Sequence, residues 1–275
     1  MGESVRTQRT FSFRESRISR VGESNGLPGY KATSGGFVLG ADWLSGSNWT
    51  FGGAFGYART STNSFDTSAT TNTYAGALYA SWMPGAFVFD GRVAAGPAMT
   101  NTSRSIVFPG ENVTATAGIR GWGGLVAGEA GYRFNLADVT LKPYVGLSAQ
   151  VFRQASFTES SDVGLAFPKQ TFRKLTSAVG MWASTTVQAQ GITYMPQARV
   201  AWTRDLRDDA LTSQAALLEE TFNINAAEPG RDAALVSINL AAWRTQTLSV
   251  YAGYTGEFRS NAASHQIAGG LRAAW

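Results

Sequence analysis

Hydrophobic and polar residues alternate along most of the chain with a period of two. The last stretch, HQIAGGLRAAW (265–275), is an example: one face carries Ile267, Leu271 and Trp275, and the other carries Gln266 and Arg272. Such alternation is the pattern of a β-strand whose two faces meet different surroundings. It recurs in segments of about ten residues, which predicts about twelve strands, at 9–19, 35–44, 49–59, 74–82, 87–96, 126–134, 140–152, 175–185, 192–202, 234–243, 248–258 and 265–275.

The two faces of these strands differ in their chemistry. One carries Leu, Val, Phe, Trp and Tyr. The other combines small residues, such as Gly40 and Gly52, which we expect to leave room in an interior, with charges of both signs that we expect to line a pore: Asp42, Asp90, Arg92, Glu129, Arg133, Lys142, Arg199, Glu257 and Arg272. We expect Asp42, Glu129 and Glu257 to pair with Arg92, Arg133 or Arg272, because a charge inside a barrel needs water or a partner.

A soluble β-sandwich also alternates, but its strands average about five or six residues. The strands predicted here approach the ~9–11 residues with which a tilted strand crosses a bilayer, which favours a membrane barrel over a sandwich. Aromatic residues near strand ends suit the interfacial girdles of such a barrel; they are Trp43, Trp49, Trp82, Phe87, Trp202, Trp243 and Trp275.

The connections between the predicted strands alternate between short and long. Short links lie at 44–48, 83–86, 135–139, 189–191 and 244–247, whereas long ones lie around 60–72, around 100–118, at 158–172 and at 204–232. This alternation of short and long links holds only if residues 211–224 belong to an external loop. A separate hairpin within that loop is compatible with the alternation. The sequence therefore predicts an all-β protein, a transmembrane antiparallel β-barrel of about 12 strands with short periplasmic turns and long extracellular loops.

Composition supports a barrel and excludes several other classes of protein. Charged residues make up 15% of the 275 residues, cysteine is absent, and the formal net charge of +4 comes from scattered Lys and Arg, so we expect no nucleic-acid partner. No apolar run is long enough for a membrane-spanning helix. Sequence motifs for catalysis or phosphate binding are missing, and the lone His265 has no Ser or Asp at a useful spacing. We expect no catalytic, cofactor-binding or metal-binding residues.

The start of the chain, MGESVRTQRT, lacks the apolar core of a signal peptide. We expect the chain to be a fragment whose targeting signal lies upstream. The corresponding domain division is a residual linker at 1–8 and a barrel at 9–275.

Several stretches together resemble the translocator domain of monomeric autotransporters, the proteins of type V secretion. They are TSGGFVLGADW (33–43), GGAFGYARTSTNSF (52–65), GEAGYRF (128–134), TLKPYVGL (140–147), RDAALVSINLAAW (231–243) and VYAGYTGEFRSNAASHQIAGGLRAAW (250–275). The resemblance implies a twelve-stranded barrel in the outer membrane of a Gram-negative bacterium, surrounded by outer-membrane lipid, monomeric, and carrying its own upstream passenger polypeptide to the cell surface.

The resemblance also implies an assembly signal and shows two departures. The barrel-assembly machinery would recognise the final strand through Ile267, Gly269, Leu271, Ala273 and Trp275. The aromatic-rich first strand of the family is represented only by RTFSFRE (9–15), and the linker helix that usually fills the pore is missing or reduced to residues 1–8. Self-cleavage of a linker is not supported, since no Asn-Asn pair occurs. A general porin and a barrel-type outer-membrane enzyme remain the alternative functions.

Overall fold

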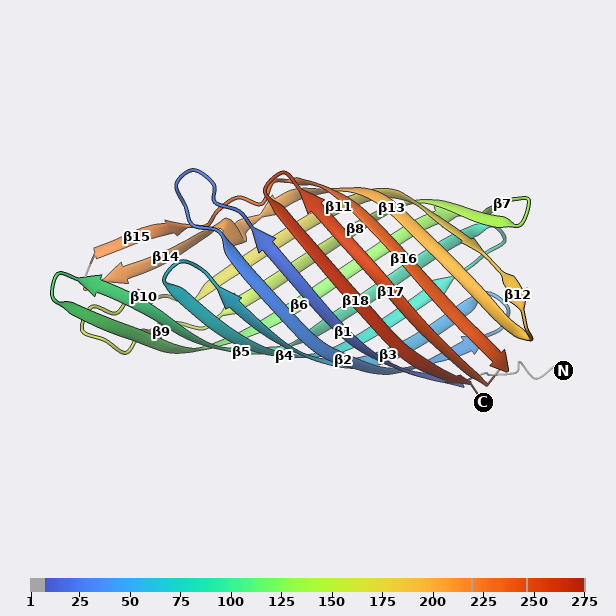
Figure 1. Ribbon diagram of the computed structural model, residues 1–275, viewed down its shortest axis with the longest axis horizontal. Helices are drawn as coiled ribbons and strands as arrows, with labels where there is room; N and C mark the ends of the chain where they lie inside the picture. Colours follow the sequence, from blue (N-terminus) through green and yellow to red (C-terminus); the bar gives the residue numbers. More distant parts are fainter. Residues whose placement is uncertain (1–7, 219, 246, 275) are drawn as a thin grey trace.

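Twelve long antiparallel strands form one closed barrel (Figure 1). The computed structural model describes residues 8–218, 220–245 and 247–274. Each long strand pairs with the next one along the chain, and β1 pairs with β18 from Arg9↔Ala274 to Val21↔Ala262, which closes the sheet. The strands are β1 (Gln8–Val21), β2 (Tyr30–Ser45), β3 (Trp49–Asn63), β4 (Thr67–Trp82), β5 (Phe87–Phe108), β6 (Glu111–Tyr132), β8 (Val139–Gln154), β11 (Gln170–Thr185), β13 (Ile192–Asp208), β16 (Asp232–Thr245), β17 (Leu248–Arg259) and β18 (Ala262–Ala274).

The twelve-stranded antiparallel barrel predicted from the alternation is confirmed, and β1 begins at Gln8. Residues 1–7, which make up most of the predicted linker segment, lie outside the described residues, as does Trp275. Closure of the sheet pairs the edge strands β1 and β18, so that the hydrogen-bonding groups of the barrel wall are satisfied within the sheet, as a membrane requires.

The strands are longer than predicted, from 12 residues in β17 to 22 in β5 and β6. The prediction of long loops around 60–72 and 100–118 is wrong. In the first region β3 continues to Asn63 and β4 already begins at Thr67. In the second, β5 and β6 are joined by a tight turn in which Gly110 has a φ of 93°. These extensions are polar and rich in Ser and Thr. The alternation of apolar residues stops where the strands leave the apolar zone, although the backbone pairing continues.

The two ends of the barrel differ. Both ends of the described chain and the short turns lie at one end, which also carries the small strands β7 (Phe134–Leu136) and β12 (Val187–Ala189) (Figure 1). The opposite end carries the longer connections and a separate four-stranded sheet in the order β15-β14-β10-β9. We call these ends the turn end and the loop end.

The separate sheet consists of β9 (Phe157–Thr158), β10 (Ala166–Phe167), β14 (Thr212–Leu217) and β15 (Glu220–Asn225), with a 3-10 turn η1 (Asp209–Leu211) before β14. The hairpin of β14 and β15 contains most of residues 211–224. It lies outside the barrel sheet, as the count of twelve barrel strands required.

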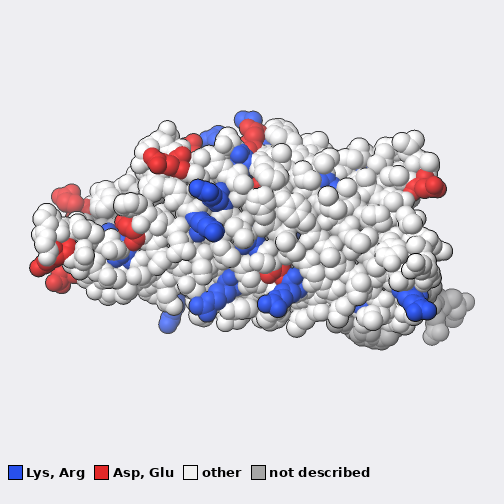
Figure 2. Space-filling view, viewed as in Figure 1, with Lys and Arg blue, Asp and Glu red and all other residues white. Residues whose placement is uncertain are grey.

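The molecule has no large internal core among its described residues: no bulky side chain there is fully buried. Large apolar side chains instead cover the outside of the barrel, with Ile267 66%, Ile238 60% and Leu78 66% exposed. On the face drawn in Figure 2, charged side chains are sparse over the half nearest the turn end. An apolar outer wall around a polar interior is the inverse of a soluble protein and matches a membrane barrel.

Candidate functional site

The interior of the barrel is the candidate functional site. Arg199 on β13 contacts Glu129 on β6 although β8 and β11 separate these strands in the sheet, so both side chains point inward. The ladder then assigns one alternating row of every strand to the inside. Residues from all twelve long strands line a single cavity of about 1210 Å³, which is the lumen.

A network of ion pairs crosses the lumen. Arg199 Nη2 lies 2.8 Å from Glu129 Oε2, and Lys142 Nζ lies 3.4 Å from Asp90 Oδ2 and 3.9 Å from Glu129 Oε1. The Arg199 Nε donates to the Tyr144 hydroxyl at 2.5 Å. The network therefore joins β5, β6, β8 and β13 and places paired charges, rather than open space, across part of the lumen.

Aromatic rings support the cationic side of this network. The Arg199 guanidinium lies 4.6 Å from the centroid of the Tyr144 ring and 4.9 Å from that of Trp182. A guanidinium over an aromatic face is attracted by the ring quadrupole, which holds its planar donors toward Glu129.

A second ion pair lies where β1 closes the barrel. Arg272 on β18 donates to Asp42 on β2 at 2.6 Å, and Tyr79 donates to the same oxygen at 3.4 Å. Asp42 is buried, with 4% of its surface exposed. Because β1 lies between β2 and β18, this pair bridges the inner surface of β1 and links the two strands that flank it.

A third cluster lies toward the loop end. Asp205 accepts hydrogen bonds from Lys174 at 2.7 Å, Arg259 at 2.6 Å and Thr176 at 2.8 Å. Arg259 also donates to the carbonyl of Gly230 in the connection before β16 at 2.8 Å. The cluster thus fixes that connection to the mouth of the barrel.

The pairing of the predicted pore residues differs in part from expectation. Asp42 does pair with Arg272, but Glu129 pairs with Arg199 and Lys142, and Glu257 pairs with Arg259 at 2.8 Å. Each charged side chain pairs with the opposite charge nearest to it across the closed sheet. The linear sequence does not show which residues become neighbours in this way.

Two predicted residues lie apart from these clusters. Arg92 is on the inner row and forms no ion pair with any described residue. Arg133 lies at the rim of the turn end, between β6 and β7, where its guanidinium donates to the carbonyl of Gly85 at 3.2 Å. The expectation that Arg133 lines the lumen and pairs with an inner carboxylate is therefore wrong, because the inner row ends with β6.

Sequence reasoning missed the inward-facing Lys174, Asp205 and Arg259. Each lies one to three residues outside a predicted strand: Lys174 before 175–185, Asp205 after 192–202 and Arg259 after 248–258. The structure extends these strands to include them, so continuing the period-two pattern by a few positions would have identified them.

Sequence reasoning also missed a group of aromatic rings inside the barrel. Phe11 and Phe13 stack with centroids 4.9 Å apart, and Phe13 contacts the Tyr251 ring at 5.2 Å. A Cβ placed on Gly40 would overlap Phe11, and one on Gly52 would overlap Tyr79. The small residues predicted to leave open space are instead covered by rings from neighbouring strands.

Aromatic side chains form two arcs on the outer wall. Near the turn end, stacked rings run across β3 to β5, from Trp49 to Trp82 at 5.4 Å and on to Phe89 at 5.4 Å. Near the loop end, Tyr57 contacts Phe37 and Tyr74 at 5.9 and 5.1 Å. Along β3 the arcs are eight residues apart, which is about 26 Å along the strand and roughly 20 Å along the barrel axis for a strand tilted by about 40°. The apolar band between the arcs is therefore close to the ~25 Å typical of outer-membrane barrels.

The predicted aromatic girdle needs one correction. Trp43, Trp49, Trp82, Phe87 and Trp202 face outward and are 38–52% exposed. Trp243 shares its row with Asn239 and Ala241, which line the lumen, and it pairs with the lumen-lining Ser249. The side to which a terminal tryptophan points follows from strand register and not from its place in the sequence.

The terminal strand β18 is paired along both edges, with β17 and β1. Ile267, Gly269, Leu271 and Ala273 share its outward row, while Trp275 lies outside the described residues. His265 is also outside the lumen, where its Nδ1 lies 2.8 Å from the Tyr254 hydroxyl and its ring contacts Phe258.

Within the described part of the chain, no three residues of the metal-binding types His, Cys, Asp and Glu gather in one place. The described residues also include no helix with the length and apolar character needed to span a membrane.

Comparison with known proteins agrees with this architecture. Residues 15–255 match the family model described as the autotransporter beta-domain. A search of curated proteins found no match.

Three solved structures share the fold. The translocator domain of autotransporter NalP from Neisseria meningitidis has a TM-score of 0.79 and 16% identity, covering 97% of this chain and 88% of that one. The beta domain of the Bordetella autotransporter BrkA has a TM-score of 0.73 and 19% identity, covering 98% and 99%. The transport unit of AIDA-I from Escherichia coli has a TM-score of 0.57 and 13% identity, covering 100% and 93%.

Because the family model covers most of the chain and the barrel matches these translocators, the chain belongs to the autotransporter β-domain family and forms an outer-membrane translocator barrel for the secretion of a passenger polypeptide.

Proposed function

We propose that the barrel inserts as a monomer into the outer membrane of a Gram-negative bacterium and passes its upstream passenger through the lumen to the cell surface. The observation that carries this proposal is a lumen lined by all twelve strands, with the start of β1 at the turn end. A polypeptide joined ahead of β1 would begin at that end and would reach the loop end through the lumen.

The size of the barrel restricts the form of the passenger. Eight strands leave an interior filled by side chains, and sixteen or more leave a wide channel. Twelve strands give an intermediate interior that suits an extended chain or one helix of ~10–12 Å diameter. A folded domain would not fit, so the passenger crosses unfolded.

The lumen has no catalytic task in this proposal. Its carboxylates are engaged by Arg and Lys partners, as in Asp42 with Arg272 and Glu129 with Arg199. Such pairs keep a polar interior hydrated and neutral while a chain moves past.

Blocking the lumen tests the route. An epitope-tagged passenger is fused upstream, and Ala77→Trp adds an inward ring while Ala80→Trp adds one on the outward row of the same strand, β4. We expect Ala77→Trp to reduce the amount of protease-accessible passenger on intact cells and Ala80→Trp to leave it near normal. Heat-modifiable migration confirms that both barrels are inserted. Equal surface display by the two variants would contradict passage through this lumen.

Insertion through the final strand is tested separately. We propose that the barrel-assembly machinery reads Ile267, Gly269, Leu271, Ala273 and Trp275 before the strand ladders form. Burial of one ring at the interface contributes only about 1–3 kcal/mol. Deletion of Trp275 should therefore lower the amount inserted in cells while the refolded barrel in detergent keeps a similar unfolding midpoint. Undiminished insertion in cells would refute this role.

A further inference from the structure

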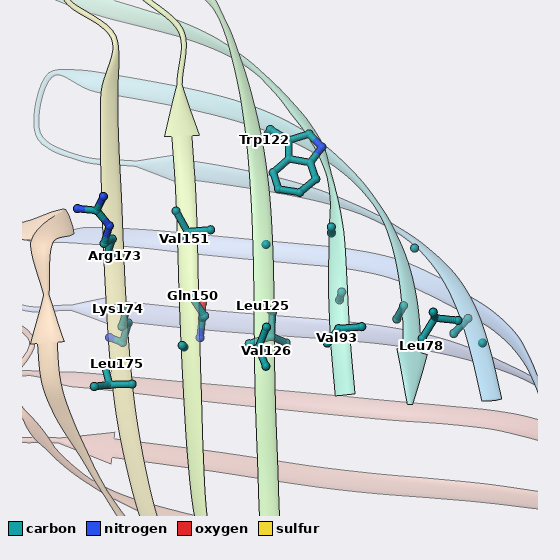
Figure 3. A pocket seen from close by; sticks show the side chains of 18 of the residues that line it. Leu78, Val93, Trp122, Leu125, Val126, Gln150, Val151, Arg173, Lys174 and Leu175 are labelled. Atoms are coloured by element: carbon teal, nitrogen blue, oxygen red, sulfur yellow. The ribbon is translucent and has the colours of Figure 1, made fainter. Parts of the chain in front are cut away.

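A groove lies on the outer wall of the barrel, separate from the lumen (Figure 3). It extends across β3, β4, β5, β6, β8 and β11, reaches Arg207 at the end of β13, and has a volume of about 930 Å³. Its floor is the outward row at Gly53, Gly76 and Gly124, where side chains are absent. A Cβ on Gly76 would meet nothing within 4 Å, whereas one on Gly124 would lie 3.3 Å from Val151.

The sides of the groove are apolar. Leu78, Val126, Val151 and the Trp122 ring border it, and the exposed fractions of Leu78 and Val126 are 66% and 60%. Trp122 lies at the middle of β6, where it pairs with Arg153 of β8 in the ladder. The groove is therefore an indentation in the part of the wall that faces hydrocarbon, and its volume is at the upper end of the ~300–1,000 Å³ found for small-molecule pockets.

An excess of positive charge lies at the end of the groove nearest the loops, where Arg173 and Arg207 line it and Asp209 is the acidic neighbour of both. Figure 3 shows Arg173 at this end. Its guanidinium forms no ion pair within 4 Å with any described residue, but Asp209 lies close enough to attract it and accepts a hydrogen bond from the backbone N–H of Arg173. Arg153 lies close by, because it pairs with Trp122 on β6 and Thr171 on β11 in the ladders and shares their outward row. Arg207 also lines this end, but Asp209 accepts from it through two hydrogen bonds of 2.8 Å.

The outward rows near the groove carry charge of one sign only. From β3 to β11, the described residues on these rows include Arg59, Arg120, Arg153 and Arg173 but no Asp or Glu. All four arginines lie in the halves of their strands toward the loop end. An apolar groove ending in exposed guanidinium groups complements a molecule with a hydrocarbon part and an anionic head.

We propose that this groove binds a phosphate-bearing lipid of the outer leaflet, with acyl chains along Gly76 and Gly124 and the phosphate at Arg173 and Arg153. Arginine suits this position because its planar guanidinium gives two parallel hydrogen bonds to phosphate. The glycine floor allows the chains to lie closer to the sheet than elsewhere on the wall. The proposal depends on the barrel being in a membrane and not on passage of the passenger.

The binding test compares two lipids that differ only in the phosphate, dimyristoyl phosphatidic acid and dimyristoyl glycerol. Each is titrated against the folded barrel in detergent, and retention of the lipid is measured by native mass spectrometry. We expect one phosphatidic acid to be retained about tenfold more tightly than the neutral lipid, the factor that corresponds to one charge-assisted contact.

Variants separate the two parts of the site. Arg153→Gln with Arg173→Gln should abolish the preference for phosphate, and Gly76→Leu should weaken retention of both lipids by filling the groove. Arg204→Gln is the matched control, since Arg204 is an outward arginine of β13 that pairs with Asp232 and does not line the groove. Heat-modifiable migration confirms folding, and Arg173→Lys should keep part of the preference.

Three results would overturn the proposal. They are equal retention of phosphatidic acid by the wild type and the Arg153→Gln, Arg173→Gln variant, displacement of the lipid by inorganic phosphate alone, and a cross-linked dimer that covers Gly76. Passenger display by the double variant distinguishes this proposal from the proposed function, because loss of lipid binding with normal display leaves the translocation route intact.

Discussion

At the scale of single residues, the lumen is organised by contacts between neighbouring strands. Gly52 on β3 has no side chain because the Tyr79 ring of β4 occupies the space where one would be. Tyr79 in turn donates to Asp42 on β2. A glycine, a ring and a carboxylate on three successive strands thus form one packed unit on the inner wall.

This unit gives a prediction for Gly52→Ala. The added methyl group would overlap the Tyr79 ring, and overpacking of this kind is typically unfavourable by about 1–3 kcal/mol. We expect a lower midpoint of urea unfolding in detergent, followed by tryptophan fluorescence. The matched control is Gly91→Ala, where a Cβ meets nothing within 4 Å.

A double-mutant cycle identifies the cause. In a Tyr79→Ala background the ring is absent, so Gly52→Ala should have little further effect on unfolding. If the same loss persists without the ring, then strand propensity at position 52, rather than packing against Tyr79, explains it.

At the scale of elements, the outward row of β18 meets lipid while its inner row meets water. Ile267 is 66% exposed in the outward row, and Ala268 pairs with Glu15 in the inner one. An arginine on the lipid face is unfavourable by about 2–4 kcal/mol near the membrane midplane and less toward its edges. The two rows should therefore respond oppositely to the same charge.

We expect Ile267→Arg to reduce the fraction of barrel that folds into lipid vesicles, measured by heat-modifiable migration. Ala268→Arg should fold close to normally, because it places the same charge on the inner row beside Glu15. Similar yields for both variants would show that β18 is not oriented as described.

The connection between β8 and β11 is fixed to the strand extensions by Glu159. This carboxylate accepts from Arg104 Nε at 3.1 Å, from a second Arg104 nitrogen, and from the backbone N–H of Leu165 at 2.9 Å. Burial by itself would raise the pKa of Glu159, but these donors outweigh it and hold the pKa below its ordinary value of 4.5. The ionised form is therefore the one that holds the connection in place.

A pH dependence follows. Because the folded-state pKa is lowered, the stabilisation is complete above about pH 4.5 and is lost as the pH falls through the folded pKa below that value. We expect residues 155–169 to exchange amide hydrogens faster as the pH falls through this range, after correction for intrinsic exchange. Glu159→Gln should show fast exchange already at pH 7. Slow, pH-independent exchange in wild type and variant alike would show that other contacts hold the connection.

At the scale of the whole molecule, the barrel is a wide frame whose lumen is narrowed by side chains. The bridge from Arg199 to Glu129 spans β6 to β13, and the cluster around Asp205 lies nearer the mouth. The lumen nevertheless contains one cavity that is lined by residues of every long strand. Ions should therefore pass through the isolated barrel, but less readily than its strand number alone would suggest.

We expect single channels in planar bilayers, and a larger conductance for Glu129→Ala with Arg199→Ala. Both partners are removed together because a single change would leave the other side chain, which is only partly exposed, without its main ion-pair partner in the lumen. Arg204→Ala, on the outer wall, is the control. An unchanged conductance in the double variant would place the narrowest point elsewhere, for instance at the Asp205 cluster.

The class of fold, the number of strands, the orientation of most side chains and the family could all be predicted from the amino-acid sequence. A wall that faces lipid requires apolar residues at every second position of each strand. Local periodicity is therefore sufficient to predict that Leu39, Phe55 and Ile267 face outward. The same logic located Asp42, Glu129 and Arg199 on the inner rows. It failed where the apolar zone ends, so the extensions of β5 and β6 were read as loops and Arg133 as a lumen residue.

Which residues contact one another became known only from the folded barrel. Glu129 and Arg199 are 70 positions apart, and Asp42 and Arg272 are 230 apart. Their contacts depend on closure of the sheet and on strand register, and neither can be recognised in the local pattern of apolar and polar residues. The outer groove has the same origin, because Gly53, Gly76 and Gly124 come together only when four strands lie side by side, with Ala95 of β5 between Gly76 and Gly124. Periodicity records which side of the wall a residue faces, whereas the curvature and stagger of the closed sheet decide which residues are its neighbours.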